Sequence, residues 1–151
     1  MLFYKYVSTG LGIGYIGKGA GTVSAAAACF FWYIFQAGYL LPSAFCIWIT
    51  LLITILGIWT SGKVEALWGK DDNKVVIDEV AGMCIALLFV PVTLKYIVIG
   101  FVLFRFFDIV KPLFIRRLET LPGGWGVMAD DVLAGIYSNI LLQLLIISPI
   151  L

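Results

Sequence analysis

The 151-residue sequence contains no histidine and only three cysteines, and both scarcities narrow the chemistry it can perform. Without histidine, catalysis through a phosphohistidine or a histidine-activated nucleophile is excluded. Cys29, Cys46 and Cys84 stand singly within apolar runs, with neither a C-x-x-C pair nor an arginine at the spacing found in thiol phosphatases. We therefore interpret the cysteines as small buried hydrophobic residues.

Charge is scarce as well, and this predicts a membrane protein. Charged residues make up 13% of the sequence and hydrophobic residues 62%, whereas soluble proteins average about 25% and about 45–50%. The mean hydropathy is +1.07. We expect a single integral-membrane domain over residues 1–151. The N-terminal residues lack the apolar core and cleavage site of a signal peptide, so the chain is expected to be inserted whole.

Five apolar runs are candidates for membrane helices, for which about 20 residues are needed to span a bilayer. They cover residues 22–39, 43–60, 75–90, 94–110 and 131–148. The second run is expected to continue as a helix to Trp68, before a polar loop over residues 71–73, and the third is short for a span. No strand-like alternation competes with helix. The predicted fold class is all-α, a small polytopic membrane bundle of about five helices.

Basic residues indicate the orientation of these helices. Of the ten lysines and arginines, only Lys95 falls in a segment expected on the far side of the membrane. The positive-inside rule therefore places the N-terminus and the loops 62–78 and 112–130 in the cytoplasm. The nine acidic residues lie in or next to the same segments. We expect the chemistry to take place at the cytoplasmic face.

Three acidic clusters interrupt the apolar runs: Asp78-Glu79, Asp108 and Asp130-Asp131. Ionisable groups at membrane depth are costly and indicate function. Adjacent acids on a helix point about 100° apart, so one can bind a metal ion while the other supports it. We expect each pair to open its helix. For Asp78-Glu79 the alternative is a simple pair of acids stabilised by the helix dipole.

Cations accompany the acids in the fourth run, where Arg105, Asp108 and Lys111 recur at helical spacing. The alternative interpretation is an ion pair between Arg105 and Asp108 within one helix. Carboxylates suit Mg²⁺, which often shares phosphate oxygens with a substrate, and guanidinium or ammonium groups complete phosphate contacts. The pattern thus indicates a metal and phosphate site.

The glycine-rich segment 10–22 leaves two interpretations open. It lacks the order of residues of a P-loop. It could present backbone N–H groups and Lys18 to an anion, or it could be a flexible entry loop at the membrane surface. Neither an aspartyl-phosphatase motif nor the D-G-x-x-A-R run of CDP-alcohol phosphotransferases occurs. Metal-assisted hydrolysis remains, with either water or a carboxylate such as Asp108 as the nucleophile.

Three blocks of the sequence resemble the bacterial phosphatidylglycerophosphatase A family. They are V-I-D-E-V-A-G-M at 76–83, F-R-F-F-D-I-V-K-P-L-F-I-R at 104–116 and G-G-W-G-V-M-A-D-D-V-L-A-G at 123–135. The resemblance implies Mg²⁺-dependent hydrolysis of phosphatidylglycerophosphate to phosphatidylglycerol in phospholipid biosynthesis. It also implies a multi-pass protein of the bacterial inner membrane whose active site faces the cytoplasm.

The resemblance and the residue pattern together suggest roles for individual side chains. The expected catalytic residues are Asp78, Glu79, Asp108, Asp130 and Asp131, and all of these except Asp108 are expected metal ligands. The expected substrate-binding residues are Thr22, Arg105, Lys111 and Arg116, and Arg117 and Lys18 are expected to steer the anionic headgroup. The N-terminal block departs from the family pattern P-G-T-x-G-S, because only Gly21 and Thr22 match it. The identity of the lipid is therefore left open.

Other functions make different predictions. A phosphatase for another membrane phospholipid would share the site. An ion-binding or transport protein would distribute charges through the membrane depth, whereas here they gather at one edge. A purely structural subunit needs none of the five acids. The expected partner is a phospholipid substrate in the membrane, and no nucleic acid. A homo-oligomer is compatible with the sequence, which leaves the oligomeric state open.

Overall fold

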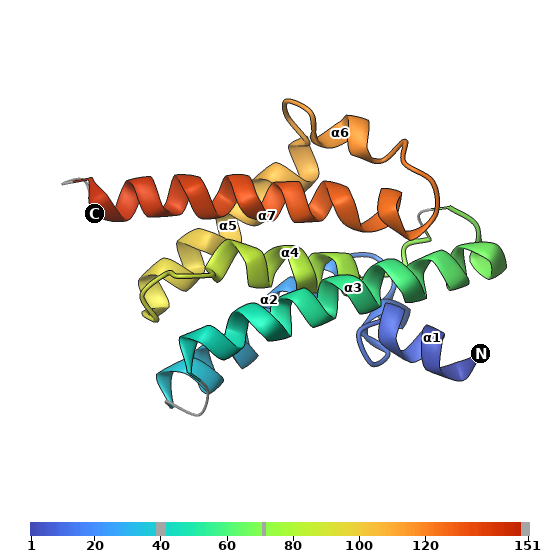
Figure 1. The fold of residues 1–151 in the computed structure, drawn as a ribbon, viewed down its shortest axis with the longest axis horizontal. Coiled ribbons are helices and arrows are strands. Elements are labelled where there is room, and N and C mark those ends of the chain that lie inside the picture. Colours follow the sequence, from blue (N-terminus) through green and yellow to red (C-terminus); the bar gives the residue numbers. More distant parts are fainter. Residues whose placement is uncertain (39–41, 71, 149–151) are drawn as a thin grey trace.

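The computed structural model describes residues 1–38, 42–70 and 72–148 and is helical throughout (Figure 1). The elements are α1 Leu2–Ser8, the 3₁₀ helix η1 Ile13–Ile16, α2 Ala20–Ala37, α3 Ser43–Trp68, α4 Ile77–Leu87, α5 Leu94–Val110, α6 Ile115–Leu118 and α7 Gly124–Ile147. No strand occurs among the described residues. The predicted all-α class is confirmed.

Three of these helices, α2, α3 and α7, are long and apolar enough to cross a membrane, which supports an integral-membrane protein. The predicted continuation of α3 to Trp68 and the shortness of α4 are confirmed. The count of five was approximate, since short helices α1 and α6 flank the long ones. Residue 39, the last of the first predicted run, and residue 71, in the predicted polar loop, lie outside the described residues.

The start of the last helix was predicted wrongly. α7 begins at Gly124, so Asp130 and Asp131 lie in its second turn and not at its N-terminus. Glycine disfavours helix, but here the missing side chains allow close packing. A Cβ on Gly124 would collide with the Ile58 carbonyl of α3, and one on Gly126 would collide with the Leu121 carbonyl. Tertiary packing therefore overrides local propensity.

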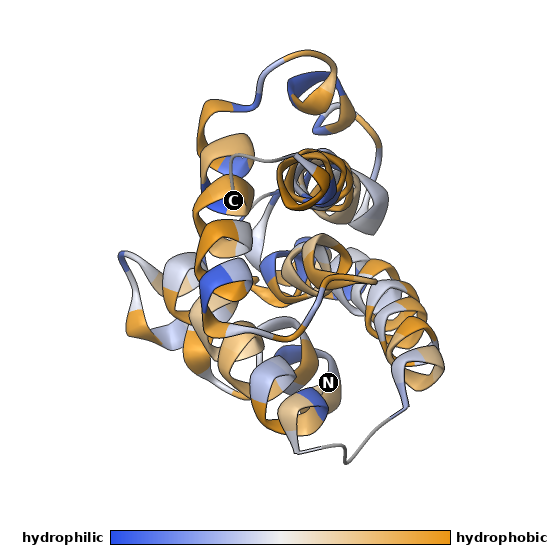
Figure 2. Ribbon diagram, turned by 90° about the vertical axis from the view of Figure 1, so that its left-hand side faces the viewer, coloured by the Kyte–Doolittle hydropathy of each residue, from blue (hydrophilic) through white to orange (hydrophobic). Residues whose placement is uncertain are grey.

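The short helix α4 lies at the centre of the bundle and packs against α2, α3, α5 and α7. Ala81, Met83, Ala86 and Leu87 are buried along its length. Apolar residues also cover the outside of the bundle, as the orange segments on its helices show in the end-on view of Figure 2. A helix bundle that is apolar both inside and outside suits a surrounding bilayer.

Two glycines set the distance between α4 and α7. A Cβ on Gly82 would lie 2.6 Å from the Asp131 carbonyl oxygen, and a Cβ on Gly135 would collide with the Gly82 backbone. Small residues let helix backbones approach closely in membrane bundles. The contact brings the opening turn of α4 beside the second turn of α7, so it positions the acids on both helices.

Asn139 of α7 donates hydrogen bonds to backbone carbonyl groups at the C-terminal end of α4. Its Nδ2 donates to the carbonyl oxygens of Ile85, Ala86 and Leu88 at 3.2, 3.0 and 2.7 Å. The last carbonyls of a helix have no partner within the helix, and no water reaches them in a hydrocarbon environment. This amide therefore holds α4 in register with α7.

The acidic clusters meet at one end of the bundle. α4 and α7 begin toward the end of the bundle that carries the N-terminus, α5 ends beside the first half of α7, and the C-terminus lies at the opposite end (Figure 1). Charges at one edge agree with the expectation for a phosphatase site. They disagree with the distribution through the membrane depth that a transport pathway would require.

Candidate functional site

A cavity of about 220 Å³ opens at the end of the bundle where the acids meet. Its lining consists of Asp72, Asn73, Val75, Asp78, Glu79, Asp108, Lys111, Glu119, Val127, Asp130 and Asp131. Among the described residues, the lining thus contains seven carboxylates and a single cationic side chain, Lys111. The five acids predicted from the sequence all contribute to it. Such an excess of carboxylates in a confined space is neutralised either by bound cations or by protons.

Three of the acids form a compact group. Asp78, Glu79 and Asp131 each offer a carboxylate oxygen, and these oxygens lie within 4.8 Å of one another. Asp78 Oδ1 and Glu79 Oε2 are buried and have no hydrogen-bond partner. Like charges held this close repel one another unless a cation or protons intervene. The unpartnered oxygens are what ligands for a metal ion provide.

The donor set fits a hard divalent cation. The group contains only carboxylate oxygens, which Mg²⁺ and Ca²⁺ prefer, and the sequence has no histidine to favour softer metals. The cysteines, which bind soft metals, are buried and are not among the cavity-lining residues. The structure therefore supports an acidic cation site at Asp78, Glu79 and Asp131.

Asp130 stands apart from this group because it is paired with a lysine. Lys111 Nζ lies 2.7 Å from Asp130 Oδ2 and also pairs with Glu119. Burial alone would lower the pKa of Lys111, but the hydrogen bonds to Asp130 and Glu119 raise it above its ordinary value. The ammonium group therefore stays charged at neutral pH and keeps a fixed positive charge in the cavity wall.

Lys111 reaches these partners from an uncommon backbone conformation. It follows the last residue of α5 with φ 49° and ψ 54°, in the left-handed region. A residue other than glycine or asparagine is uncommon there, and such strain clusters at functional sites. The turn ends α5 before Pro112 and directs the side chain back toward α7. The residue with the uncommon backbone conformation is thus the one that forms the ion pairs across the cavity.

Arg105 and Asp108 form the ion pair within α5 that the sequence left as an alternative. Asp108 also lines the cavity and is among the charged neighbours of Asp131. Arg105 is not among the lining residues, and its Nε is buried without a partner. The Arg105 guanidinium is therefore paired with Asp108 without being exposed in the cavity.

The remaining expected substrate-binding residues lie outside the cavity. Thr22 and Arg116 are exposed and do not line it, as is also the case for Lys18 and Arg117. Of the four expected substrate contacts, only Lys111 lies in the wall. α2 instead approaches through Gly21, where a Cβ would collide with the Glu79 carboxylate. The absence of a side chain there makes room for this acid.

Two acids that line the cavity, Asp72 and Glu119, were not predicted as site residues from the sequence. Asp72 lies in the loop before α4, where its carboxylate accepts hydrogen bonds from the Lys74 backbone N–H at 2.9 Å and from Lys74 Nζ at 3.0 Å. Glu119 follows α6. The one available signal was their position in the polar loops that precede α4 and α7, because both loops return to the same end of the bundle.

The glycine-rich segment packs against the loop that precedes α4. The Val76 N–H donates to the Ser8 carbonyl at 2.8 Å, and a Cβ on Gly14 would collide with the Lys74 carbonyl. Gly12, Gly17 and Gly19 each adopt positive φ, which glycine allows without steric cost. The glycines thus permit the close turns that bring the N-terminal segment against the entrance to α4.

Comparison with known proteins relates the chain to one family. The sequence profile of the family described as Phosphatidylglycerophosphatase A matches residues 6–146. A Bacteroides thetaiotaomicron protein provisionally named phosphatidylinositol-3-phosphatase is 44% identical, over 90% of this chain and 89% of the relative. Phosphatidylglycerophosphatase A of Haemophilus influenzae is 37% identical (89% and 83% covered) and that of Escherichia coli 31% identical (89% and 78% covered). No solved structure matches the chain.

Proposed function

We propose that this chain, which belongs to the phosphatidylglycerophosphatase A family, hydrolyses the terminal phosphate monoester of phosphatidylglycerophosphate. The products are phosphatidylglycerol and inorganic phosphate. The family predicted from the three acidic blocks is confirmed. The observation that carries the proposal is the cavity in which seven carboxylates face a single lysine at one end of a membrane bundle.

Mg²⁺ is the proposed cofactor, held by Asp78, Glu79 and Asp131, with Asp130 as a further ligand. The unpartnered oxygens of Asp78, Glu79 and Asp130 support this assignment. A bound divalent ion supplies Lewis-acid polarisation of a phosphoryl oxygen and neutralises its charge. The same ion relieves the repulsion among the acids, so the phosphate of an anionic lipid can approach a cavity that would otherwise repel it.

The other side chains of the cavity bind the phosphate and activate the water. Lys111, charged and fixed by Asp130 and Glu119, attracts the phosphoryl oxygens. Asp108, held by Arg105, orients water and accepts its proton. The water oxygen joins phosphorus, the bond from phosphorus to the glycerol oxygen breaks, and a proton passes to that oxygen. In the alternative route, the Asp108 carboxylate attacks phosphorus and displaces the glycerol oxygen of the lipid, which takes up a proton, and water then hydrolyses the acyl phosphate to free phosphate and the Asp108 carboxylate.

The active site is proposed to face the cytoplasm. The exposed basic residues Lys18, Arg116 and Arg117 belong to the segments that the positive-inside rule assigns to that side. They would steer an anionic headgroup toward the cavity without lining it. A thiol-labelling assay with single cysteines placed at Lys18 or Arg117, in intact bacterial cells and in inverted membranes, tests this orientation.

A second lipid is also a candidate substrate. The Bacteroides thetaiotaomicron relative, at 44% identity, carries a name that specifies a phosphatidylinositol phosphate. Both lipids present a phosphate monoester on a polyol headgroup, so the same cavity could act on either. The incomplete N-terminal block around Gly21 and Thr22 is a reason to measure both.

The test is phosphate release by the detergent-purified protein from phosphatidylglycerophosphate, phosphatidylinositol 3-phosphate and phosphatidic acid, with and without Mg²⁺. We expect Mg²⁺-dependent release from the first lipid, lost in Asp78→Asn. The matched control is Glu65→Gln, because Glu65 does not line the cavity. Preference for the inositol lipid would transfer the proposal to that substrate. Folded protein with no release from any of the three lipids would refute the phosphatase.

A second measurement distinguishes the two nucleophiles. A single turnover in water enriched in ¹⁸O, followed by mass spectrometry of the peptide that contains Asp108, detects oxygen exchange into its carboxylate. Label in the released phosphate, with no acyl hydroxamate at Asp108 when hydroxylamine is present as a trap, supports direct attack by water, because an acyl phosphate cleaved at phosphorus would also label the phosphate. Label in Asp108 supports a carboxylate nucleophile, because hydrolysis of an acyl phosphate leaves one solvent oxygen on the enzyme when water attacks the acyl carbon.

A further inference from the structure

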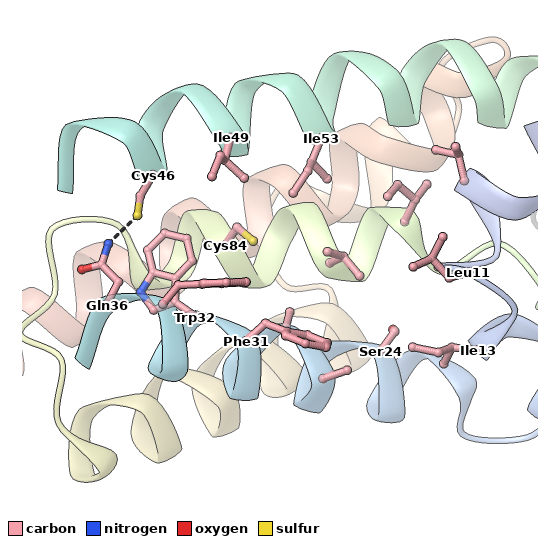
Figure 3. A pocket seen from close by; sticks show the side chains of 17 residues that line it. Leu11, Ile13, Ser24, Phe31, Trp32, Gln36, Cys46, Ile49, Ile53 and Cys84 are labelled. Atoms are coloured by element: carbon pink, nitrogen blue, oxygen red, sulfur yellow. Dashed lines mark hydrogen bonds between the residues drawn. The ribbon is translucent and has the colours of Figure 1, made fainter. Parts of the chain in front are cut away.

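A second cavity, an apolar groove of about 380 Å³, runs between α2, α3 and α4 (Figure 3). Its volume lies in the range of about 300–1,000 Å³ that is usual for small-molecule sites. Ile13, Phe31, Ile49, Ile53 and Val80 are among the side chains that line it. The reaction at the phosphate makes no use of this groove.

The groove and the acidic cavity meet at a contact between α2 and α4. Val80, which lines the groove, follows Glu79, which lines the acidic cavity. The Glu79 carboxylate packs on Gly21 of α2, and Ser24, one turn later on α2, already belongs to the groove. A charged compartment therefore passes into an apolar one within one helical turn.

Polar side chains at the two ends of the groove make hydrogen bonds within the protein. Ser24 Oγ donates to the Gly21 carbonyl at 2.8 Å. At the other end the Gln36 side-chain amide bonds to Cys46 Sγ and joins α2 to α3 (Figure 3). Between these residues the labelled side chains that point into the groove are apolar or cysteine. An occupant of this surface gains chiefly by burying hydrocarbon.

The length of the groove matches a hydrocarbon chain in one leaflet. Ser24 and Gln36 are twelve residues apart on α2, which corresponds to about 18 Å at a rise of about 1.5 Å per residue. Half of the hydrocarbon core of a bilayer is about 15 Å thick. A lipid with its phosphate among the acids could therefore lay one chain along the whole groove.

We propose that this groove binds one acyl chain of the lipid substrate while the headgroup phosphate occupies the acidic cavity. The inference rests on the proposed lipid phosphatase function and adds that the enzyme recognises the hydrocarbon as well as the phosphate. The groove selects lipids by chain length, since burial of each methylene group adds to the binding of substrate and transition state alike.

The experiment fills the groove and compares substrates of different chain length. Ala27 lines the groove, whereas its neighbour Ala26 is exposed and does not. Ala27→Phe and the matched control Ala26→Phe are assayed for kcat/KM on dihexanoyl and dipalmitoyl forms of the preferred lipid. We expect Ala27→Phe to lose at least about 10-fold on the long-chain relative to the short-chain lipid, the effect of about two methylene groups. Ala26→Phe should retain the wild-type ratio.

Equal loss on both chain lengths, or the same change in both variants, would overturn the proposal. If Ala27→Phe fails to fold, Ile49→Ala replaces it, because widening the groove should shift the preference toward longer or branched chains. An unchanged chain-length profile in folded Ile49→Ala would count against the groove.

A binding measurement separates the groove from the proposed reaction. Phosphatidic acid with a diazirine in one acyl chain is photolysed on the wild-type protein, and labelled peptides are mapped. Labelling concentrated at α2 and α3 residues of the groove, and competed by unlabelled lipid, supports the proposal even if phosphate release fails. Uniform labelling over the outer helix surfaces overturns the groove even if the phosphatase is active.

Discussion

Replacing Lys111 by methionine tests whether the cavity depends on its lysine. The substitution keeps an unbranched side chain, one atom shorter, at the same left-handed backbone position, and it removes the ammonium group that lies 2.7 Å from Asp130 Oδ2. The Asp130 side chain is 8% exposed and Lys111 is 22% exposed. The lost partner therefore leaves a carboxylate without compensation in a largely dehydrated place.

The magnitude follows from the burial of the pair. Removal of one partner of a buried ion pair costs about 3–5 kcal/mol, and the partial exposure of Lys111 favours the lower end. Glu119, whose side chain is 33% exposed, adds less than about 1 kcal/mol. We expect Lys111→Met to lower the free energy of unfolding by about 3 kcal/mol. For a chain of this size that corresponds to about 6–12 °C in Tm.

The assay is thermal unfolding in detergent with a chelator present, so that no divalent cation replaces the lost charge. Lys63→Met, at an exposed position of α3, is the matched control and should melt like the wild type. The double variant Lys111→Met/Asp130→Asn should regain most of the loss, because it removes the uncompensated charge. A shift below about 2 °C in the single variant, or no recovery in the double variant, would refute the reasoning.

The pH dependence of this pair has a defined sign. The hydrogen bonds raise the pKa of Lys111 above its ordinary value, so its contribution to stability is fully present below the unfolded lysine pKa of about 10.4. It is lost as pH rises through the folded-state pKa. The difference in Tm between wild type and Lys111→Met should therefore stay constant from pH 7 to 9 and shrink above about pH 10.5.

Three further predictions concern the bundle and its cation. Gly82→Ala should force α4 from the Asp131 backbone and reduce activity at least about 10-fold with a loss of roughly 1–3 kcal/mol in stability; unchanged activity would contradict the close approach. Asn139→Leu should destabilise by roughly 1–3 kcal/mol because α4 carbonyls lose their donor, measured by thermal unfolding beside an exposed control, Ile140→Ala. Removal of divalent cations by EDTA should abolish phosphate release, and added Mg²⁺ should restore it and raise Tm; full activity in EDTA would exclude the metal.

Much of the fold could be read from the sequence because membrane insertion is governed by local composition. The run at residues 94–110 and the continuation of α3 to Trp68 agree with the helices observed. Apolar residues at a membrane's length must form helices, since backbone groups find no other partner in hydrocarbon. The start of α7 could not be read in this way, because its glycines serve a contact with Ile58 and Leu121 that only the folded chain contains.

The acids themselves were also evident from the sequence, since charges stand out in an apolar chain. Their grouping was not, because it depends on distances between helices. Asp78, Glu79 and Asp131 converge through the close approach of Gly82 and Gly135. A spacing pattern reports which residues share a face of one helix, and it carries no information about the neighbour that this face meets.

The sequence by itself determined the class of this protein, its helical runs and the one edge to which its charges belong, because hydropathy and charge act locally along the chain. Only the tertiary structure decided the partners. It joined Lys111 to Asp130 and Glu119 and left Thr22 outside the cavity. These outcomes depend on which helix ends pack side by side, and packing is a property of the whole folded chain.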